Sequence, residues 1–409
     1  MKSPKSSNKT SAKKLRIALS KKIVFRLLNR LNNCHLEICD GDEYYLFGDH
    51  ASDLKASVRI ADQKAYTKIL HGGSVGAAEA YVHGMWSADN LVNVIRIFSR
   101  NLQILENFEK TFGPFYKVLN SIHHLFRMNS KSGSRTNISA HYDLSPEMYK
   151  GFLDSDMQYS SAVFPHQDSG LEEAQKHKMQ LICQKLELEK YDHLLEIGSG
   201  WGGLACFAAK NWGCDVTTTT ISKEQFASAK KRIKEQGLQS KVNLLFKDYR
   251  DLQGQYSKIV SVEMIEAVGN RFLPMYFRKL NDLLSPGGRL VLQCITMNDQ
   301  RYQQYCNDVD FIQKYIFPGG HLPSLSEIFK QIKKNTNLYV VGLADYREHY
   351  AKTLKEWRQR FLSRKEIVSS AGLNDDFIRL WEYYFCYCEG GFRESAIGIA
   401  QLEAVKNKY

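Results

Sequence analysis

A glycine-rich segment in the middle of the chain has the residue types that bind a nucleotide-like ligand. Residues 196–203 read Glu-Ile-Gly-Ser-Gly-Trp-Gly-Gly, between a strand-like stretch (193–195) and a helix-like one (204–210). Glycine lets the backbone turn sharply and approach a ligand closely, and the helix start offers free N–H groups to an anion. The spacing is not that of dinucleotide sites, and Glu196 adds a carboxylate. The pattern favours S-adenosylmethionine, whose sulfonium and amine are cationic; a purely structural turn is the alternative.

Two later strand ends support this interpretation. A strand predicted over 214–220 is followed by Ile221, and another over 242–246 is followed by Asp248-Tyr249-Arg250. Open parallel sheets bind ligands at the carboxyl ends of their strands. The first of these strands lacks the acidic residue usual for a ribose, so Thr220 and Gln225 are the expected substitutes. Tyr249 is expected to cover the adenine, with core packing as the alternative.

The order of elements predicts the fold that positions these residues. From Leu181 onward, helices alternate with buried strands, which is typical of a parallel sheet with crossover helices. Residues 35–70 alternate polar and apolar and predict a small antiparallel sheet, followed by helical patterning from about Val75 to Arg100 and on to Met128. We therefore predict an α/β fold, a Rossmann-like class I methyltransferase with a mostly parallel sheet, plus a smaller N-terminal α+β domain. The predicted domains are a basic amphipathic segment (1–33), the α+β domain (34–128), a linker (129–140) and the catalytic domain (141–409).

Charge and composition narrow the environment of the protein. Of 409 residues, 56 are basic and 44 acidic, and the first 33 residues hold ten Lys or Arg and no acid. Leucine or isoleucine recurs every fourth residue from Leu15 to Leu31, which predicts a basic amphipathic helix. Such a helix either lies on an anionic membrane surface or packs on its own domain. Nine scattered cysteines predict neither a disulfide framework nor a metal site, and no apolar run is long enough to cross a bilayer. We expect a cytoplasmic protein, peripheral on the inner face of the membrane.

Several motifs taken together resemble the cyclopropane fatty acid synthases of the bacterial full-length type. The resemblance runs from about residue 70 to 400. The motifs are His141-Tyr142-Asp143-Leu144, Met157-Gln158-Tyr159-Ser160-Ser161, residues 196–203, Thr220-Ile221-Ser222, Glu263-Met264-Ile265-Glu266-Ala267-Val268-Gly269, Tyr315-Ile316-Phe317-Pro318-Gly319-Gly320, Asp345, His349-Tyr350, Thr353-Leu354, Trp357 and Gly391-Phe392-Arg393.

The resemblance implies methyl transfer from S-adenosylmethionine to a cis double bond of an unsaturated phospholipid acyl chain, followed by proton loss and ring closure. It also implies bicarbonate as the proton acceptor, in a cage that maps onto Glu266, Tyr315, the backbone of Ile295, Ser161 and Gln293. Ser161 stands where the family has Cys, and Gln293 where it has His, so the position of Gln293 cannot carry a positive charge. The predicted cofactor-binding residues are Tyr159, Ser160, Glu196, Gly198, Gly200, Gly202, Thr220, Ile221, Gln225, Asp248, Tyr249 and Arg250.

Other functions fit the sequence less well. The two departures in the cage keep open a related lipid methyltransferase that gives a methylene- or methyl-branched acyl chain. A nucleic-acid methyltransferase is disfavoured because the chain has no Pro-Pro pair and the basic stretch lacks interleaved aromatic residues, so no nucleic-acid partner is expected. A lipid-binding protein with a decayed site is disfavoured by the intact glycine loop and Glu266. The sequence leaves a homodimer open.

Overall fold

The computed structural model describes residues 5–104, 146–364 and 374–408, which form two units. Unit 1 comprises the described parts of 1–123 and 362–394, and unit 2 those of 124–361 and 395–409. The predicted linker at 129–140 and the motif at 141–144 lie outside the described residues.

Unit 1 is built on a four-stranded sheet with the order β2-β1-β3-β4. The strands are β1 (His35–Asp40), β2 (Glu43–Gly48), β3 (Lys55–Ile60) and β4 (Trp86–Ala88), and the helices are α1 (Lys5–Leu28), α2 (Lys64–Val82), α3 (Leu91–Arg100) and α16 (Asp375–Arg393). The predicted sheet is present, but β1 and β3 are parallel. The β1–β2 hairpin returns the chain to the start of β1, where His35 pairs with Gly48, so β3 begins at the same end as β1.

The number of helices predicted between Val75 and Arg100, and the residue at which the first one begins, need correction. The helix predicted from about Val75 to Arg100 is two helices, separated by β4. α2 begins at Lys64 and is kinked at Gly73, whose φ of 54° is in the left-handed region that glycine tolerates.

The helix α16, which the sequence analysis placed in the catalytic domain, packs in unit 1. The Tyr81 hydroxyl donates to Glu382 at 2.9 Å, and Arg96 pairs with Glu394 at 2.6 Å. Gly390 allows close approach, because a Cβ there would lie 2.6 Å from Cγ2 of Ile95. A domain boundary at 141 therefore separates α16 from the helices it contacts.

Unit 2 contains a seven-stranded sheet with the order β10-β11-β9-β8-β5-β6-β7. The strands are β5 (His193–Ile197), β6 (Asp215–Thr220), β7 (Val242–Phe246), β8 (Tyr256–Val262), β9 (Leu284–Met297), β10 (Leu338–Asp345) and β11 (Ile397–Lys406). β5 to β9 are parallel, and β11 is inserted antiparallel between β9 and β10. The strand order reverses at β5, between β6 and β8, and ligands bind in such crevices of open α/β sheets.

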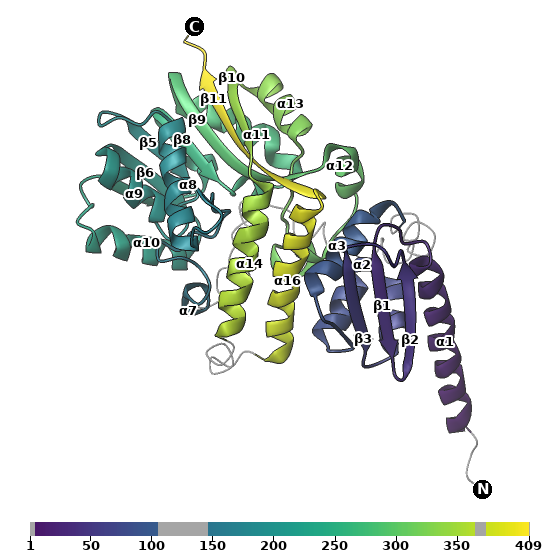
Figure 1. Ribbon diagram of the computed structural model, residues 1–409. Coiled ribbons are helices and arrows are strands. Elements are labelled where there is room, and N and C mark those ends of the chain that lie inside the picture. Colours follow the sequence, from purple (N-terminus) through teal and green to yellow (C-terminus); the bar gives the residue numbers. More distant parts are fainter. Residues whose placement is uncertain (1–4, 105–145, 365–373, 409) are drawn as a thin grey trace. The chain divides into compact units, whose positions relative to one another are not determined.

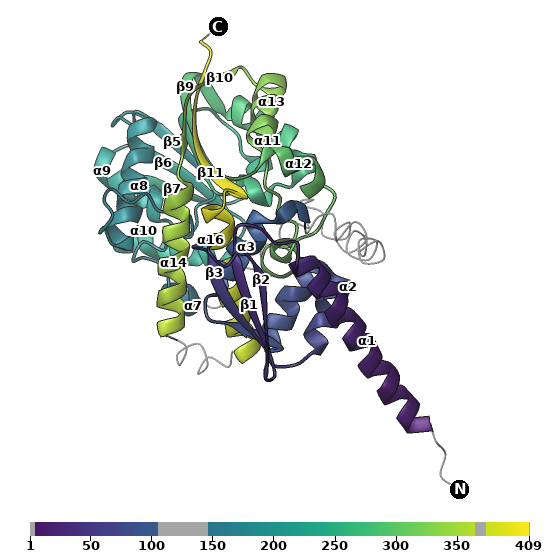
Figure 2. The same ribbon diagram turned by 45° about the vertical axis from the view of Figure 1, so that its right-hand side comes forward.

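Helices lie on both faces of this sheet (Figures 1 and 2): α8 (Leu171–Lys185), α9 (Gly203–Trp212) and α10 (Lys223–Glu235) on one, and α11 (Leu273–Leu283) and α13 (Leu325–Asn335) on the other. The other helices described in unit 2 are α7 (Pro146–Lys150), α12 (Asp299–Tyr305) and α14 (Arg347–Ser363), with the short helices η1 (Tyr249–Asp251), η2 (Ile265–Ala267), η3 (Asn270–Phe272) and η4 (Ile312–Ile316). Successive strand residues point to opposite faces, so Leu194 packs in the core under α8 and α9, while Leu195 packs in the core under α11 and α13. The predicted Rossmann-like methyltransferase fold is confirmed.

Candidate active site

The glycine loop connects β5 to α9 and leaves open space at one position. Gly198, Gly200 and Gly202 have φ values of 99°, 47° and 84°. Among the described residues, a Cβ at Gly200 would meet no atom within 4 Å, whereas one at Gly202 would lie 3.0 Å from Cβ of Ala229 in α10. Gly202 therefore serves helix packing, and Gly200 borders the space that a ligand could fill.

Glu196 precedes this loop as a buried carboxyl group. Its Oε2 accepts a hydrogen bond from the Thr218 hydroxyl at 2.5 Å. Burial raises the pKa of Glu196 to about 8, although the Thr218 hydrogen bond and the charge of Lys178 oppose the rise. A cationic ligand beside Glu196 would favour its ionised form.

The polar residues predicted at the end of β6 lie together. Thr220 donates to Oε1 of Gln225 at 2.9 Å and accepts from the N–H of Ser222 at 3.1 Å. Thr220 and Gln225 are buried, and Ile221 between them is half-buried. The hydrogen bonds fix the two side chains that were expected to replace an acidic residue.

The end of β7 is held by an ion pair. Asp248 accepts from Nε of Arg250 at 2.8 Å and from its Nη2 at 2.6 Å. Tyr249 packs edge-on against Tyr276 at 5.5 Å between ring centroids, and burial raises its pKa to about 12. Part of the Tyr249 ring is therefore in contact with the core. The cofactor contacts of Asp248, Tyr249 and Arg250 stay predictions.

A buried lysine that the sequence analysis missed holds the segment with Tyr159 and Ser160. The Lys178 side chain is fully buried, and its Nζ donates to Oγ of Ser160 at 2.7 Å and to Oε1 of Gln158 at 3.0 Å. Burial lowers the pKa of Lys178 to about 8, against the charges of Glu263 and other carboxylates. The sequence signal that could have identified Lys178 is its helical spacing relative to the apolar residues of the same helix.

That spacing places Lys178 on the buried face of α8. This face comprises Leu171, Ala174, Gln175, Lys178, Met179, Ile182 and Cys183. Tyr159 lies in an aromatic cluster, with its ring centroid 5.5 Å from that of Tyr149 and 5.3 Å from that of Trp357.

Two of the residues predicted for the bicarbonate cage, Ser161 and Gln293, donate hydrogen bonds to Glu263, which was not predicted as a site residue. Oε1 of Glu263 accepts from the N–H of Ser161 and from Nε2 of Gln293, both at 2.8 Å. Its Oε2 accepts from the Tyr350 hydroxyl at 2.7 Å. The Ser161 hydroxyl itself donates to the carbonyl of Ala162 at 3.0 Å.

Glu266 and Ile295 form the other part of the predicted cage. The Ile295 N–H donates to Oε1 of Glu266 at 2.5 Å, while Oε2 is buried without a hydrogen-bond partner among the described residues. Burial, and secondly the charge of Glu263, raise the pKa of Glu266 to about 8. Glu266 is therefore predominantly protonated at neutral pH, and its unpartnered oxygen can donate a hydrogen bond.

Tyr315 lies in η4, and 39% of its surface is exposed. Its ring packs against Phe311 at 5.7 Å between centroids, and the Lys314 ammonium lies 5.0 Å from its centroid. Its place in the cage stays a prediction.

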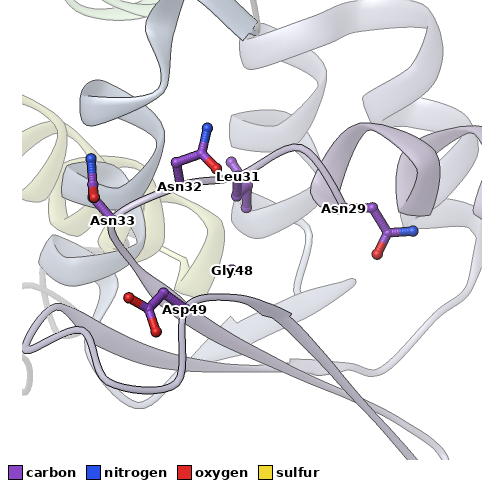
Figure 3. A pocket seen from close by; sticks show the side chains of 6 residues that line it. All are labelled: Asn29, Leu31, Asn32, Asn33, Gly48 and Asp49. Atoms are coloured by element: carbon purple, nitrogen blue, oxygen red, sulfur yellow. The ribbon is translucent and has the colours of Figure 1, made fainter.

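A separate hollow of about 380 Å³ lies in unit 1, where α1 is followed by β1 and β2 ends. It is lined by Asn29, Leu31, Asn32, Asn33, Gly48 and Asp49. These side chains do not converge on one point (Figure 3), and the hollow contains none of the predicted site residues.

The seven-stranded, largely parallel sheet is that of class I S-adenosylmethionine-dependent methyltransferases, and the open position at Gly200 and the buried Glu196 are compatible with that cofactor. The family model of mycolic acid cyclopropane synthetase matches residues 129–402. The chain belongs to this family of lipid methyltransferases.

Individual relatives differ in their named activities. Tuberculostearic acid methyltransferase UfaA1 of Mycobacterium tuberculosis (strain ATCC 25618 / H37Rv) is 36% identical over 83% of this chain and 80% of its own length. Cyclopropane-fatty-acyl-phospholipid synthase of Escherichia coli (strain K12) is 33% identical over 85% and 87%. The crystal structure of mycolic acid cyclopropane synthase CmaA1 with SAH and CTAB superposes with a TM-score of 0.63 and 27% identity, over 66% of this chain and 98% of that one. Homologous structures thus bind the demethylated form of the predicted cofactor.

Proposed function

We propose that this methyltransferase is a cyclopropane fatty acid synthase that adds a methylene from S-adenosylmethionine to the cis double bond of unsaturated acyl chains in phospholipids. The observation that carries the proposal is the position of two buried carboxyl groups next to the glycine loop. A Cβ at Gly198 would lie 3.2 Å from Cγ of Met264, so the loop contacts the segment that contains Glu263 and Glu266.

This arrangement suits attack of an alkene on a sulfonium methyl group. The attack leaves a carbocation on the acyl chain, which a nearby negative charge stabilises. Glu263 is positioned to supply that charge: burial raises its pKa, and the three hydrogen bonds to its carboxyl group and the charge of Lys178 oppose the rise. Glu196, on the preceding strand end, is the expected partner of the cationic amine or sulfonium.

The resemblance implies bicarbonate as the proton acceptor. Three of its expected donors are already engaged: the Gln293 amide by Glu263, the Ile295 N–H by Glu266, and the Ser161 hydroxyl by the Ala162 carbonyl. The residues present therefore offer a bicarbonate few free donors. The dependence of turnover on bicarbonate is the measurement that tests this part of the proposal.

The product of the reaction tests the proposal directly. We expect phospholipid vesicles with monounsaturated chains, incubated with protein and methyl-labelled S-adenosylmethionine, to gain one labelled CH₂ unit and lose the double bond. Mass spectrometry after chemical cleavage of double bonds measures both changes. A labelled chain that keeps a double bond would indicate the alternative, a methylene- or methyl-branched product, which the naming of one relative as a methyltransferase makes worth testing. Saturated vesicles are the control, and label in them would contradict the proposal.

We further propose that α1 brings the enzyme to an anionic membrane surface. None of the described helices is long and apolar enough to cross a membrane. The last part of α1 packs in unit 1, where Val24, Leu27 and Leu28 are buried. Its first half extends beyond the sheet of that unit (Figures 1 and 2), and Leu15 and Leu19 are 73% and 58% exposed. The packed-helix alternative thus holds for the last part of the helix, and the proposed membrane contact concerns the part with the exposed leucines.

We expect the double substitution Leu15→Gln and Leu19→Gln to weaken binding to anionic vesicles about tenfold or more, because two exposed apolar side chains no longer enter the lipid. Vesicle sedimentation measures the affinity. Leu46→Gln, at a site in β2 that is 50% exposed, is the control and should leave binding unchanged. Equal affinity of the double variant and the wild type would contradict the role of α1.

A further inference from the structure

Residues predicted to bind an anion around the reaction site already bind a carboxyl group that belongs to the protein. The Ser161 N–H and the Gln293 amide both donate to Oε1 of Glu263. The Gln293 amide is held in turn, because its Oε1 accepts from Nε2 of Gln401 at 2.7 Å. A carboxylate and a bicarbonate present the same pair of oxygens to such donors. The Glu263 side chain thus takes the Gln293 donor that was expected to bind a bicarbonate, together with the backbone N–H of Ser161, another residue of the predicted cage.

The backbone at Glu263 indicates that this position is specifically maintained. Its φ of 48° is in the left-handed region, which costs a residue with a Cβ about 1 kcal/mol or more. Its N–H donates to the carbonyl of Gln293 at 2.7 Å, so strand β9 fixes both ends of the residue. A strained conformation of this kind persists only when surrounding contacts determine it, and such conformations cluster at active sites.

We propose that Glu263 replaces bicarbonate as the proton acceptor of the reaction. This inference rests on the proposed function, since it concerns the proton lost after methyl transfer to an acyl double bond. Oε2 of Glu263 has the Tyr350 hydroxyl as its donor among the described residues, which leaves that oxygen one acceptor position for a proton.

The step balances without another reactant. The π electrons of the alkene form a bond to the sulfonium methyl carbon, and the carbon–sulfur pair leaves with S-adenosylhomocysteine. The second alkene carbon becomes a carbocation. A C–H pair of the new methyl group closes the ring onto this carbon, and the proton moves to the Glu263 carboxylate, which becomes a neutral acid. Release of that proton to solvent restores the carboxylate for the next turnover.

The groups around Glu263 separate its role from that of Glu266. Lys178 and the Tyr350 hydroxyl face Glu263 and favour its ionised form. Burial raises the pKa of Glu263, and these hydrogen bonds and the Lys178 charge oppose the rise. Among the described residues, the donors to Glu266 are backbone groups, and burial raises the pKa of the Cys294 thiol near both carboxyl groups, so this thiol stays protonated. Of the two glutamates, Glu263 is the base and Glu266 the neutral acid.

The first measurement is the dependence on bicarbonate in buffers stripped of carbon dioxide. We expect wild-type turnover to be unchanged when bicarbonate is removed and returned. Glu263→Gly relieves the strained backbone and opens the space of the carboxylate. We expect the turnover of this variant to fall by a factor of about 10² to 10⁴, as for loss of an acid–base group. Added bicarbonate or formate should restore part of the lost turnover. The affinity for S-adenosylhomocysteine should stay within about threefold of the wild type.

Two further variants separate proton transfer from packing. Glu263→Gln can still accept from Ser161 and Gln293 and can donate to the Tyr350 oxygen, but it cannot take the proton. We expect it to fold, to lose turnover to a similar extent and to resist rescue, because its side chain fills the space. Glu187→Gly is the matched control, since Glu187 has a φ of 50° and only an exposed ion pair with Arg289. It should keep full turnover.

Calorimetry gives a readout that does not depend on turnover. Bicarbonate titrated into the apoprotein should give no binding heat with the wild type and a measurable heat with Glu263→Gly. Wild-type turnover that falls on bicarbonate removal, or an active Glu263→Gln variant, would overturn the inference. An absence of any methylated lipid from wild-type protein would instead contradict the proposed function, so the two failures are distinguishable.

Discussion

Gly200→Val is expected to abolish binding of S-adenosylhomocysteine, with a loss of affinity above about 100-fold, or ~2.7 kcal/mol. The reason is the open space at this position, where a Cβ would meet no atom within 4 Å in the part of the chain that the structure describes. A valine side chain would occupy the space assigned to the methionine part of the cofactor. In addition, a β-branched residue is strained at a φ of 47°. Isothermal titration calorimetry measures the affinity.

The control for this variant must carry the same backbone strain away from the loop. Gly237 follows α10, has a φ of 67° and would likewise place a Cβ in open space. Gly237→Val should lose comparable stability and bind S-adenosylhomocysteine as the wild type does. If Gly200→Val folds and binds with wild-type affinity, the loop does not hold the cofactor.

Trp357→Ala is expected to have the largest effect on stability, lowering the free energy of unfolding by about 3–5 kcal/mol. Trp357 is fully buried in α14, and its ring lies 6.0 Å from Phe152, 5.3 Å from Tyr159 and 6.1 Å from Tyr350 between centroids. Truncation leaves a cavity beside Tyr159, a predicted cofactor-binding residue, and beside Tyr350, which donates to Glu263. Chemical denaturation measures the change.

Trp357→Phe should cost much less than truncation to alanine. The indole Nε1 is buried with no hydrogen-bond partner among the described residues, so phenylalanine removes an unsatisfied donor and keeps most of the ring contacts. Trp212→Ala, at a half-buried site at the end of α9, should also cost less. A cost for Trp357→Ala no greater than for Trp212→Ala would show that the aromatic cluster is not a tightly packed core.

The sequence predicts the parts of the molecule that depend on local pattern. The alternation of strands and helices from Leu181, and the strand ends before Gly198 and Ile221, follow from periodicity and glycine placement, and the structure has them at those positions. The position of β3 beside β1 depends on where the hairpin returns the chain, and periodicity carries no information about that.

The missed site residues depend on contacts between distant segments. Glu263 receives its donors from residues 161, 293 and 350, and Lys178 contacts residues 158 and 160. In the sequence, Glu263 looks like an ordinary acid at a strand end, and Lys178 like one of several charges in a polar helix. Only the folded chain shows that both are buried. The roles of the predicted residues Tyr315, Asp248 and Arg250 toward ligands remain predictions.

The placement of α16 has a consequence for synthesis on the ribosome. The helices α2 and α3 are complete by residue 100, but the helix that covers Ile95 and accepts from Tyr81 ends at Arg393. At roughly 5–20 residues per second, the nascent N-terminal unit waits about 15–60 s for its last helix. Its uncovered apolar side chains are exposed to chaperones and to other nascent chains during that time. Synonymous codons that slow translation between these helices would therefore lower the yield of folded protein.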